Sequence, residues 1–319
     1  MTPGPMSPSG AARRSPFAGV LAPVLTPFKH DLAPDPERLL RHCRWLLGQG
    51  CSGLAVFGTT SEANSLTVDE RSDLLAGLVA GGLDPGRLMP GTGCCALPDT
   101  VRLTREAVAA GCGGVLVLPP FYYKNVSDEG LFRSFAELIE RVGDARLRVY
   151  LYHFPQMSMI GFSPTLVERL LGTYPGIVAG IKDSSGDFTY SAALVQRFGA
   201  AGFEVFVGTE RLLLPNLRAG GAGCISATAN VAPAPMVALC RSFGGADAEA
   251  LQVRLDGLRA VIEKGAMIPS LKEILAHWSG DPAWRDVRPP LIELGRAQAG
   301  ALVAELERRE FSMPALRGT

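Results

Sequence analysis

The stretch Val178-Ala179-Gly180-Ile181-Lys182-Asp183-Ser184-Ser185-Gly186 decides how the rest of this chain is interpreted. An apolar run ends in one amine and passes into turn residues, which is the pattern of a buried strand followed by a loop. Only five of the 31 basic residues are lysines, so arginine is used where charge alone is needed. A lysine at the end of an apolar strand therefore indicates an amine that can lose its proton and attack a carbonyl. The alternative is a lysine that reaches solvent or pairs with Asp183.

The same rhythm of strand, loop and helix continues on both sides of this strand. Eight strands are predicted: Val20–Leu25, Gly53–Phe57, Leu88–Gly91, Gly114–Leu118, Val149–Phe154, Val178–Lys182, Glu204–Gly208 and Gly223–Ile225. The helices predicted between them include Pro36–Leu47, Val68–Ala80, Asp99–Ala110, Glu129–Val142, Pro164–Tyr174 and Arg211–Ala219. Eight such units predict an α/β fold, a (β/α)8 TIM barrel. A doubly wound sheet shares the alternation, but no G-x-G-x-x-G follows the first strand.

The chain divides into three regions by composition and pattern. Residues 1–15 are rich in Pro, Ser and Gly, and we expect a disordered tail. Arg13-Arg14 could mark an export signal, but the apolar stretch that follows is short and is broken by Pro23. Residues 16–243 form the predicted barrel. Residues 244–319 contain no predicted strand, and the helices Ala248–Glu263, Ser270–Trp278 and Leu291–Arg309 predict a helical C-terminal region that contributes to an oligomer contact.

Composition excludes several classes of function. The 319 residues carry no net charge, so no basic surface for nucleic acid is expected. No run of about 18 apolar residues occurs, so no membrane span is expected. Seven cysteines without a C-x-x-C spacing indicate reduced thiols in the cytoplasm, and neither they nor the four scattered histidines predict a metal site.

Polar residues follow the predicted strands, at the end of a barrel where active sites lie. An amine that forms an iminium ion with a ketone needs a proton shuttle and a site for the substrate carboxylate. Tyr152 ends the strand before that of Lys182, so it is a candidate shuttle; the alternative is a core tyrosine. Gly58-Thr59-Thr60 offers consecutive N–H groups and two hydroxyls for a carboxylate. Its alternative is an ordinary turn between a strand and a helix.

Five segments together resemble the dihydrodipicolinate synthase and N-acetylneuraminate lyase family of Schiff-base aldolases. They are Gly58-Thr59-Thr60-Ser61-Glu62, Pro120-Phe121-Tyr122-Tyr123, Leu151-Tyr152-His153-Phe154-Pro155, Gly180-Ile181-Lys182-Asp183 and Gly223-Cys224-Ile225-Ser226. Their order and spacing are similar to those of the family from about Phe17 to Phe243, and the helical C-terminal region also fits. No single segment is specific, but the combination is.

The resemblance implies a role for each matching residue. Lys182 would form a Schiff base with pyruvate or a related 2-oxo acid, with Tyr152 as the proton relay. Thr59 and Thr60 would hold the carboxylate, and Thr60 would continue the relay. Tyr123 would enter the active site of a neighbouring subunit, in a dimer of dimers, and Ile225 would line the pyruvate pocket. The resemblance implies no metal and no organic cofactor.

Departures from the family's motifs concern the second substrate, an aldehyde. Its pocket would include His153, Gln156, Met157 and Glu210, and Gly208 is a further candidate for substrate binding. His153 would either donate a hydrogen bond to the aldehyde or serve only as a packing residue. In true dihydrodipicolinate synthases, which this segment resembles, an arginine binds the carboxylate of the aldehyde. Met157 stands at that position here, so a neutral aldehyde is favoured. Glu210-Arg211 only half matches the acidic pair of the sialic acid lyases. Ser61 replaces the usual glycine of the Thr-Thr-Gly-Glu turn, which makes the conformation of that turn an open question.

We therefore expect a cytoplasmic class I lyase or aldolase that makes or cleaves a bond between a 2-oxo acid and an aldehyde, with a possible dehydration. One alternative is authentic 4-hydroxy-tetrahydrodipicolinate synthase, which uses pyruvate and aspartate semialdehyde. An alternative of another class is a non-catalytic 2-oxo acid binding protein on the same barrel, because function lies in the site and not in the fold.

Overall fold

Seven parallel strands form the sheet of the computed structural model, which describes residues 17–314. They are β1 (Gly19–Ala22), β2 (Gly53–Leu54), β3 (Val115–Val117), β4 (Val149–His153), β5 (Val178–Asp183), β6 (Glu204–Val207) and β7 (Gly223–Ile225), in the order β2-β1-β7-β6-β5-β4-β3. The predicted tail, residues 1–15, lies outside the described residues.

The eighth predicted strand, Leu88–Gly91, fills the gap between β2 and β3. The Met89 N–H donates to the Leu54 carbonyl at 2.8 Å, and the Leu116 N–H donates to the Pro90 carbonyl at 2.9 Å. Isolated parallel bridges join Leu88 to β2 and Gly91 to β3. The sheet thus closes on itself, and the prediction of a (β/α)8 barrel is confirmed.

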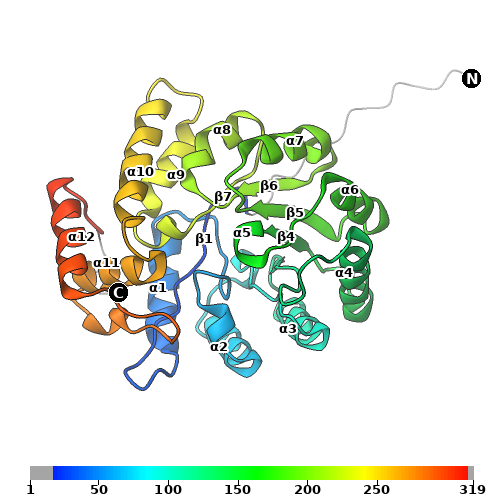
Figure 1. Ribbon diagram of the computed structural model, residues 1–319, viewed down its shortest axis with the longest axis horizontal. Helices are drawn as coiled ribbons and strands as arrows, with labels where there is room; N and C mark the ends of the chain where they lie inside the picture. The colour runs from blue at the N-terminus through cyan, green and yellow to red at the C-terminus, as the bar shows by residue number, and fades with distance from the viewer. Residues whose placement is uncertain (1–16, 315–319) are drawn as a thin grey trace, which may run out of the picture.

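Helices surround the barrel (Figure 1). Those of the barrel region are α1 (Pro36–Gly48), α2 (Val68–Ala80), α3 (Leu97–Ala109), α4 (Asp128–Val142), α5 (Pro155–Ser158), α6 (Pro164–Thr173), α7 (Phe188–Phe198), α8 (Leu213–Arg218) and α9 (Pro233–Ser242). Thr67 and Glu70 form a capping box at the start of α2, and the Ser163 hydroxyl accepts the Leu166 N–H at the start of α6. Short 3-10 turns connect several elements, including η1 (Ala63–Ser65), η4 (Glu210–Leu212) and η5 (Ala227–Asn230).

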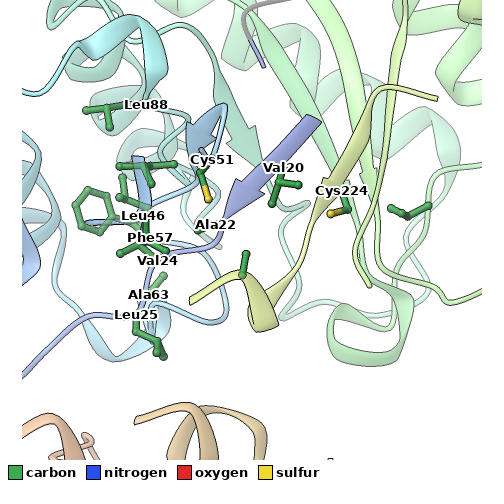
Figure 2. Close-up of a cluster of buried hydrophobic side chains, with 14 of the residues drawn as sticks. Val20, Ala22, Val24, Leu25, Leu46, Cys51, Phe57, Ala63, Leu88 and Cys224 are labelled. Atoms are coloured by element: carbon green, nitrogen blue, oxygen red, sulfur yellow. The ribbon is translucent and has the colours of Figure 1, made fainter. Parts of the chain in front are cut away.

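Side chains alternate between the inside of the barrel and the layer under the helices. On β1, Leu21 packs inside with Tyr150 and Phe206, whereas Val20 and Ala22 pack against the helices. Figure 2 shows part of this outer layer, which includes the side chains of Val20 and Ala22 on β1 and of Cys224 on β7. The same alternation turns Lys182 inward, because its neighbour Ile181 belongs to the outer layer.

The C-terminal region consists of α10 (Ala248–Ile262), α11 (Met267–Ser279), η6 (Pro282–Arg285) and α12 (Arg296–Arg308), which lie to one side of the barrel in Figure 1. The predicted helix Leu291–Arg309 begins five residues too early. Leu291 instead lies in a loop that lines a cavity at the carboxyl end of the strands, and Gly295 caps α12. No helix within residues 17–314 has the length and apolar character needed to cross a membrane.

Candidate active site

Lys182 and Tyr152 face each other inside the barrel. Their Cα atoms are partners in the register between β4 and β5, so both side chains point the same way. The Lys182 Nζ atom donates to the Tyr152 hydroxyl at 3.2 Å and lies 4.2 Å from the centre of its ring. Both residues are buried. Asp183, the alternative partner, points to the other side, where its carboxylate accepts the Ser191 hydroxyl at 2.5 Å.

The turn after β2 brings two threonines to the same place. The Thr59 hydroxyl lies 3.3 Å from the Tyr152 hydroxyl, so lysine, tyrosine and threonine form one chain of polar groups. Within residues 17–314, the N–H groups of Thr59 and Thr60 and the Thr60 hydroxyl have no hydrogen-bond partner. These free donors are what a carboxylate requires.

Ser61 fits the turn without a left-handed backbone. The residues of positive φ are Phe57 before the turn (60°) and Glu62 at its end (56°). The Ser61 hydroxyl donates to the Val24 carbonyl at 2.5 Å and accepts the Gly58 N–H at 3.2 Å. The side chain that replaces the expected glycine therefore ties the turn to the segment after β1.

These groups form one wall of a cavity of about 550 Å³ at the carboxyl end of the strands. The residues that line it include six of the candidate site residues, Lys182, Tyr152, Thr59, Thr60, Ile225 and Gly208. Gly208 leaves no room for a side chain, because an added Cβ atom would lie 2.1 Å from the Ser184 hydroxyl oxygen. The cavity thus places a buried amine, a phenol and free N–H groups around one space.

Comparison with known proteins assigns this chain to a family. Residues 16–309 match the model of the dihydrodipicolinate synthetase family. The chain belongs to this family. A protein of Chloroflexus aurantiacus described as an uncharacterized DapA-like lyase is 35% identical over 294 residues, which cover 91% of this chain and 96% of that protein.

Solved structures of the family share the fold. The crystal structure of dihydrodipicolinate synthase from Agrobacterium tumefaciens has a TM-score of 0.84 and 32% identity, over 91% of this chain and 98% of that one. A prophage protein of the same family from E. coli K12, solved in complex with pyruvate, also has a TM-score of 0.84, with 27% identity over 92% and 99% of the two chains. The family is named for a synthetase, and the relative from Chloroflexus aurantiacus is described as a lyase, which supports an enzyme.

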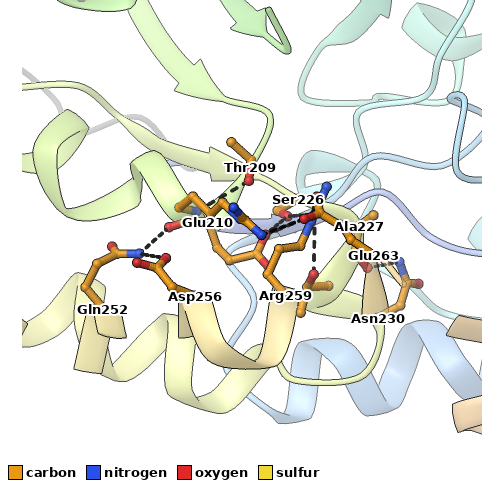
Figure 3. Close-up of polar contacts among 11 residues, drawn as sticks. Thr209, Glu210, Ser226, Ala227, Asn230, Gln252, Asp256, Arg259 and Glu263 are labelled. Carbon is orange, nitrogen blue, oxygen red and sulfur yellow. Dashed lines mark hydrogen bonds and ion pairs between the residues drawn. The ribbon is translucent and has the colours of Figure 1, made fainter. Parts of the chain in front are cut away.

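Glu210 lies behind the cavity wall of this family member. Its side chain is fully buried, and one carboxylate oxygen accepts from the Ser226 hydroxyl and from Arg259, whose Nη1 atom lies at 3.2 Å. Figure 3 shows Arg259 between Glu210, Ser226 and Glu263. Arg259 and Glu263 line the cavity, together with Thr209 and Arg211 on either side of the buried carboxylate. In the described part of the chain, no His, Cys, Asp and Glu side chains are grouped to hold a metal ion.

Three further residues predicted for the aldehyde pocket have different positions. Met157 lines the cavity and is 60% exposed. The Gln156 amide donates to the Ser185 carbonyl at 2.5 Å, and Gln156 is not among the described residues that line the cavity. His153 is also not among the described residues that line the cavity. Its ring stacks on that of Tyr190 with centroids 4.4 Å apart, and its Nδ1 atom accepts the Phe162 N–H.

Strand alternation explains the position of His153. It follows Tyr152 directly, so it points into the outer layer when Tyr152 points inward. Burial there lowers the pKa of His153 from its usual value, and the charge of Asp183 opposes this effect. The structure does not bring this imidazole to the amine.

Tyr123 lies at an exposed tip of the loop after β3. Tyr122 and Tyr123 are 74% and 76% exposed, and their rings meet edge to face with centroids 5.3 Å apart. Of the residues described, those that line the cavity of the same chain do not include Tyr123. Its predicted role therefore depends on a neighbouring subunit.

The C-terminal region contributes residues to the site that no sequence motif predicted. Arg259 and Glu263 come from α10, and Met267, Ile268 and Pro269 come from the start of α11. No local motif marks these residues as part of a site. The i,i+4 spacing of Arg259 and Glu263 is ordinary for a surface helix, and only the packing of the region against the barrel gives them a role.

Proposed function

We propose that this protein is a class I lyase or aldolase whose Lys182 forms a Schiff base with pyruvate or another 2-oxo acid. The contact of 3.2 Å between the Lys182 Nζ atom and the Tyr152 hydroxyl, at the wall of the cavity, carries this proposal. An amine placed beside a group that can give and take a proton is the arrangement that iminium chemistry needs.

Lys182 in its neutral form attacks the keto carbon of the 2-oxo acid. The nitrogen lone pair forms the N–C bond, and Tyr152 relays the proton that moves from nitrogen to the carbonyl oxygen. A second proton lets that oxygen leave as water, which gives the iminium ion. In the cleavage direction, the hydroxyl group on the carbon that becomes the aldehyde gives its proton to the relay, and the electrons of the C–C bond move to the iminium ion. The aldehyde leaves, and the enamine that remains is protonated and hydrolysed. The reverse sequence makes the bond.

Thr59 and Thr60 would hold the carboxylate of the 2-oxo acid. Two N–H groups and one hydroxyl without intramolecular partners lie next to the Lys182–Tyr152 pair within the described structure. Hydrogen bonds to a charged acceptor are stronger than those between neutral groups, so these donors can fix the acid without a cation. The relative from E. coli K12 that was solved with pyruvate supports this class of substrate.

A neutral, hydroxylated aldehyde fits best in the part of the cavity that Met157 and the charged side chains after β6 and on α10 line. Arg211 and Arg259 line it, but both bind Glu263, at 2.6 and 2.7 Å, and Arg259 also binds Glu210. Two arginines and two carboxylates leave no net charge, and Met157 adds apolar surface. A second carboxylate, as in aspartate semialdehyde, would find no unpaired cation among these groups.

Borohydride reduction in the presence of pyruvate, followed by peptide mass mapping, tests the proposal. We expect a stable pyruvyl adduct on Lys182. A screen of aldehydes, with aspartate semialdehyde beside neutral hydroxyaldehydes, then separates the aldolase from authentic 4-hydroxy-tetrahydrodipicolinate synthase. If 2-oxo acids bind reversibly and no adduct forms, the protein is a binding protein and the proposal is wrong.

We propose further that the protein acts in the cytoplasm as a dimer of dimers. The exposed pair Tyr122 and Tyr123 supports the assembly, because such aromatic side chains are typical of interfaces. Light scattering on the purified protein tests the size of the assembly, and a monomer would contradict it. Cell fractionation tests the location.

A further inference from the structure

We propose that Lys272 positions the turn that holds the substrate carboxylate, and that it does so through Glu62. The proposal rests on the function proposed above, because it assigns a task to the turn of Thr59 and Thr60. The Lys272 Nζ atom lies 2.6 Å from a Glu62 carboxylate oxygen. The two side chains are 0% and 1% exposed, although Lys272 belongs to α11 and Glu62 follows β2.

Both oxygens of the Glu62 carboxylate are held by the C-terminal region. One binds Lys272, and the other accepts the Arg288 N–H at 3.0 Å. Lys272 also donates to the Asp286 carbonyl at 2.7 Å, and its amine lies 4.5 Å from the centre of the Phe28 ring. The Arg288 side chain in turn binds Glu70 at the start of α2. The carboxylate of Glu62 is therefore fixed in direction by groups far away in sequence.

Stability alone is a poor explanation for this pair. Removing two charges from water costs much of what their attraction returns, so apolar side chains of similar size commonly serve stability as well. Burial lowers the pKa of Lys272, and the attraction of Glu62 opposes this effect. A buried pair with defined geometry specifies one arrangement of the backbone that carries it, which an apolar contact does less strictly.

Glu62 forms the end of the turn of Thr59 and Thr60, which would hold the carboxylate of the substrate. Glu62 lies two residues after Thr60, at φ 56° and ψ 36°, where residues other than glycine are uncommon. Its N–H donates to the Thr59 carbonyl at 3.1 Å. Holding the Glu62 side chain from outside thus fixes the peptide groups of Thr59 and Thr60, whose N–H groups remain free for the substrate.

The same helix forms part of the cavity wall. Met267, Ile268 and Pro269 in the first turn of α11 line the cavity, and Lys272 follows one turn later. A movement of α11 would therefore change the wall and the carboxylate turn together. We infer that the C-terminal region and the barrel act as one catalytic unit.

The test measures how pyruvate occupies the site in Glu62→Gln and Lys272→Met. Glu62→Gln keeps the shape of the side chain and removes the charge that pairs with Lys272. The readout is the pyruvate concentration that gives half-maximal borohydride trapping on Lys182, with KM and kcat beside it. We expect this concentration and KM to rise about tenfold or more in both variants, whereas the extent of trapping at saturation and kcat change by less than about threefold.

Glu273→Gln is the matched control. Glu273 belongs to α11, as Lys272 does, but its carboxylate binds Arg285 at 2.7 Å and makes no contact with the turn of Thr59 and Thr60. It should lower stability and leave the half-maximal concentration unchanged. If Lys272→Met does not fold, Glu62→Gln decides. An unchanged concentration in the folded variants, or an equal rise in Glu273→Gln, overturns the inference and leaves the Schiff base intact. Absence of any adduct in the unaltered protein overturns the proposed function and this inference with it.

Discussion

The Nζ atom of Lys182 lies 3.2 Å from the hydroxyl oxygen of Tyr152 because two neighbouring parallel strands place these residues in register. The contact belongs to the rigid sheet and not to a loop. Sites built on strands keep their geometry better than sites built on loops. The pair is therefore preorganised before any substrate enters.

Replacing Lys182 by Arg should abolish the reaction. Arginine keeps the positive charge but does not provide a neutral amine, so no N–C bond can form. We expect no borohydride-trapped adduct and a fall in kcat/KM of at least about a thousandfold. Lys264→Arg, at an exposed position outside the cavity lining, is the control and should behave as the unaltered protein. Full activity of Lys182→Arg would exclude the proposed mechanism.

Tyr152→Phe should slow proton transfer and spare the amine. We expect kcat to fall about 100-fold or more, because the relay next to Lys182 and Thr59 is lost. Borohydride should still trap an adduct, at a lower rate. Tyr190→Phe is the control: its hydroxyl donates to the Phe162 carbonyl in the outer layer, so its loss should affect stability by about 1 kcal/mol and not kcat. Equal effects of the two substitutions would contradict a relay at Tyr152.

Strand patterns predicted the barrel and the central pair because both depend on local sequence. Lys182 lies at the end of one predicted strand and Tyr152 near the end of the strand before it, so the strand pattern alone predicts that both lie at the same end of the barrel. The two-residue period of a strand also explains His153: residues that follow one another on a strand point to opposite sides. Tyr152 and His153, as neighbours on one strand, therefore do not both face the cavity.

Contacts between distant segments could not be predicted from the sequence. Glu210 follows β6 as expected, but η4 turns its carboxylate toward Arg259 and away from the cavity. The direction of a side chain in such a turn depends on a partner 49 residues later. The pairing of Glu62 with Lys272 is likewise set by the packing of α11 on the barrel.

Met157→Arg should change which aldehyde is accepted. Met157 lines the cavity where a cation could meet a second carboxylate, and an arginine binds a carboxylate through two hydrogen bonds. We expect kcat/KM for aspartate semialdehyde, relative to a neutral hydroxyaldehyde, to rise about tenfold or more. Met159→Arg is the control, because Met159 is 67% exposed and lies outside the lining among the described residues. A rise of equal size in the control would indicate attraction by charge alone.

His42 should make the protein less stable in mild acid. Burial lowers its pKa from 6.5 to about 4, and the hydrogen bond with Asn230 opposes this effect. Above pH 6.5 the imidazole is neutral in the folded and unfolded states. Below pH 6.5 the unfolded chain binds a proton that the folded chain does not bind until about pH 4. The free energy of unfolding should therefore fall in this window by at most about 1.4 kcal/mol per pH unit, and then level off.

Urea unfolding at pH 7 and pH 4.5 measures this contribution. His42→Gln removes the group that titrates, so the difference between the two pH values should become smaller in the variant. His30→Gln, at an exposed position, is the control and should keep the full difference. If His42→Gln keeps it as well, another group is responsible for the loss in acid.

Tyr123 should act in the active site of a neighbouring subunit. It is 76% exposed and lies outside the lining of its own cavity in the described structure, so only a partner could use its hydroxyl for the reaction. We expect Tyr123→Phe to lower kcat by about tenfold or more if that hydroxyl takes part in proton transfer. Tyr122→Phe, the adjacent ring, is the matched control and should retain activity.

Mixing two impaired proteins separates a role in the partner's site from a role in the protein's own site. In a hybrid of Tyr123→Phe and Lys182→Arg subunits, a chain with an intact Lys182 can receive an intact Tyr123 from its neighbour. Activity should therefore return when the two variants are unfolded together and refolded, up to about a quarter of the unaltered value for random pairing in which each pair of subunits shares its tyrosines. If Tyr123 acted within its own chain, every hybrid would contain one defect per site, and no activity would return.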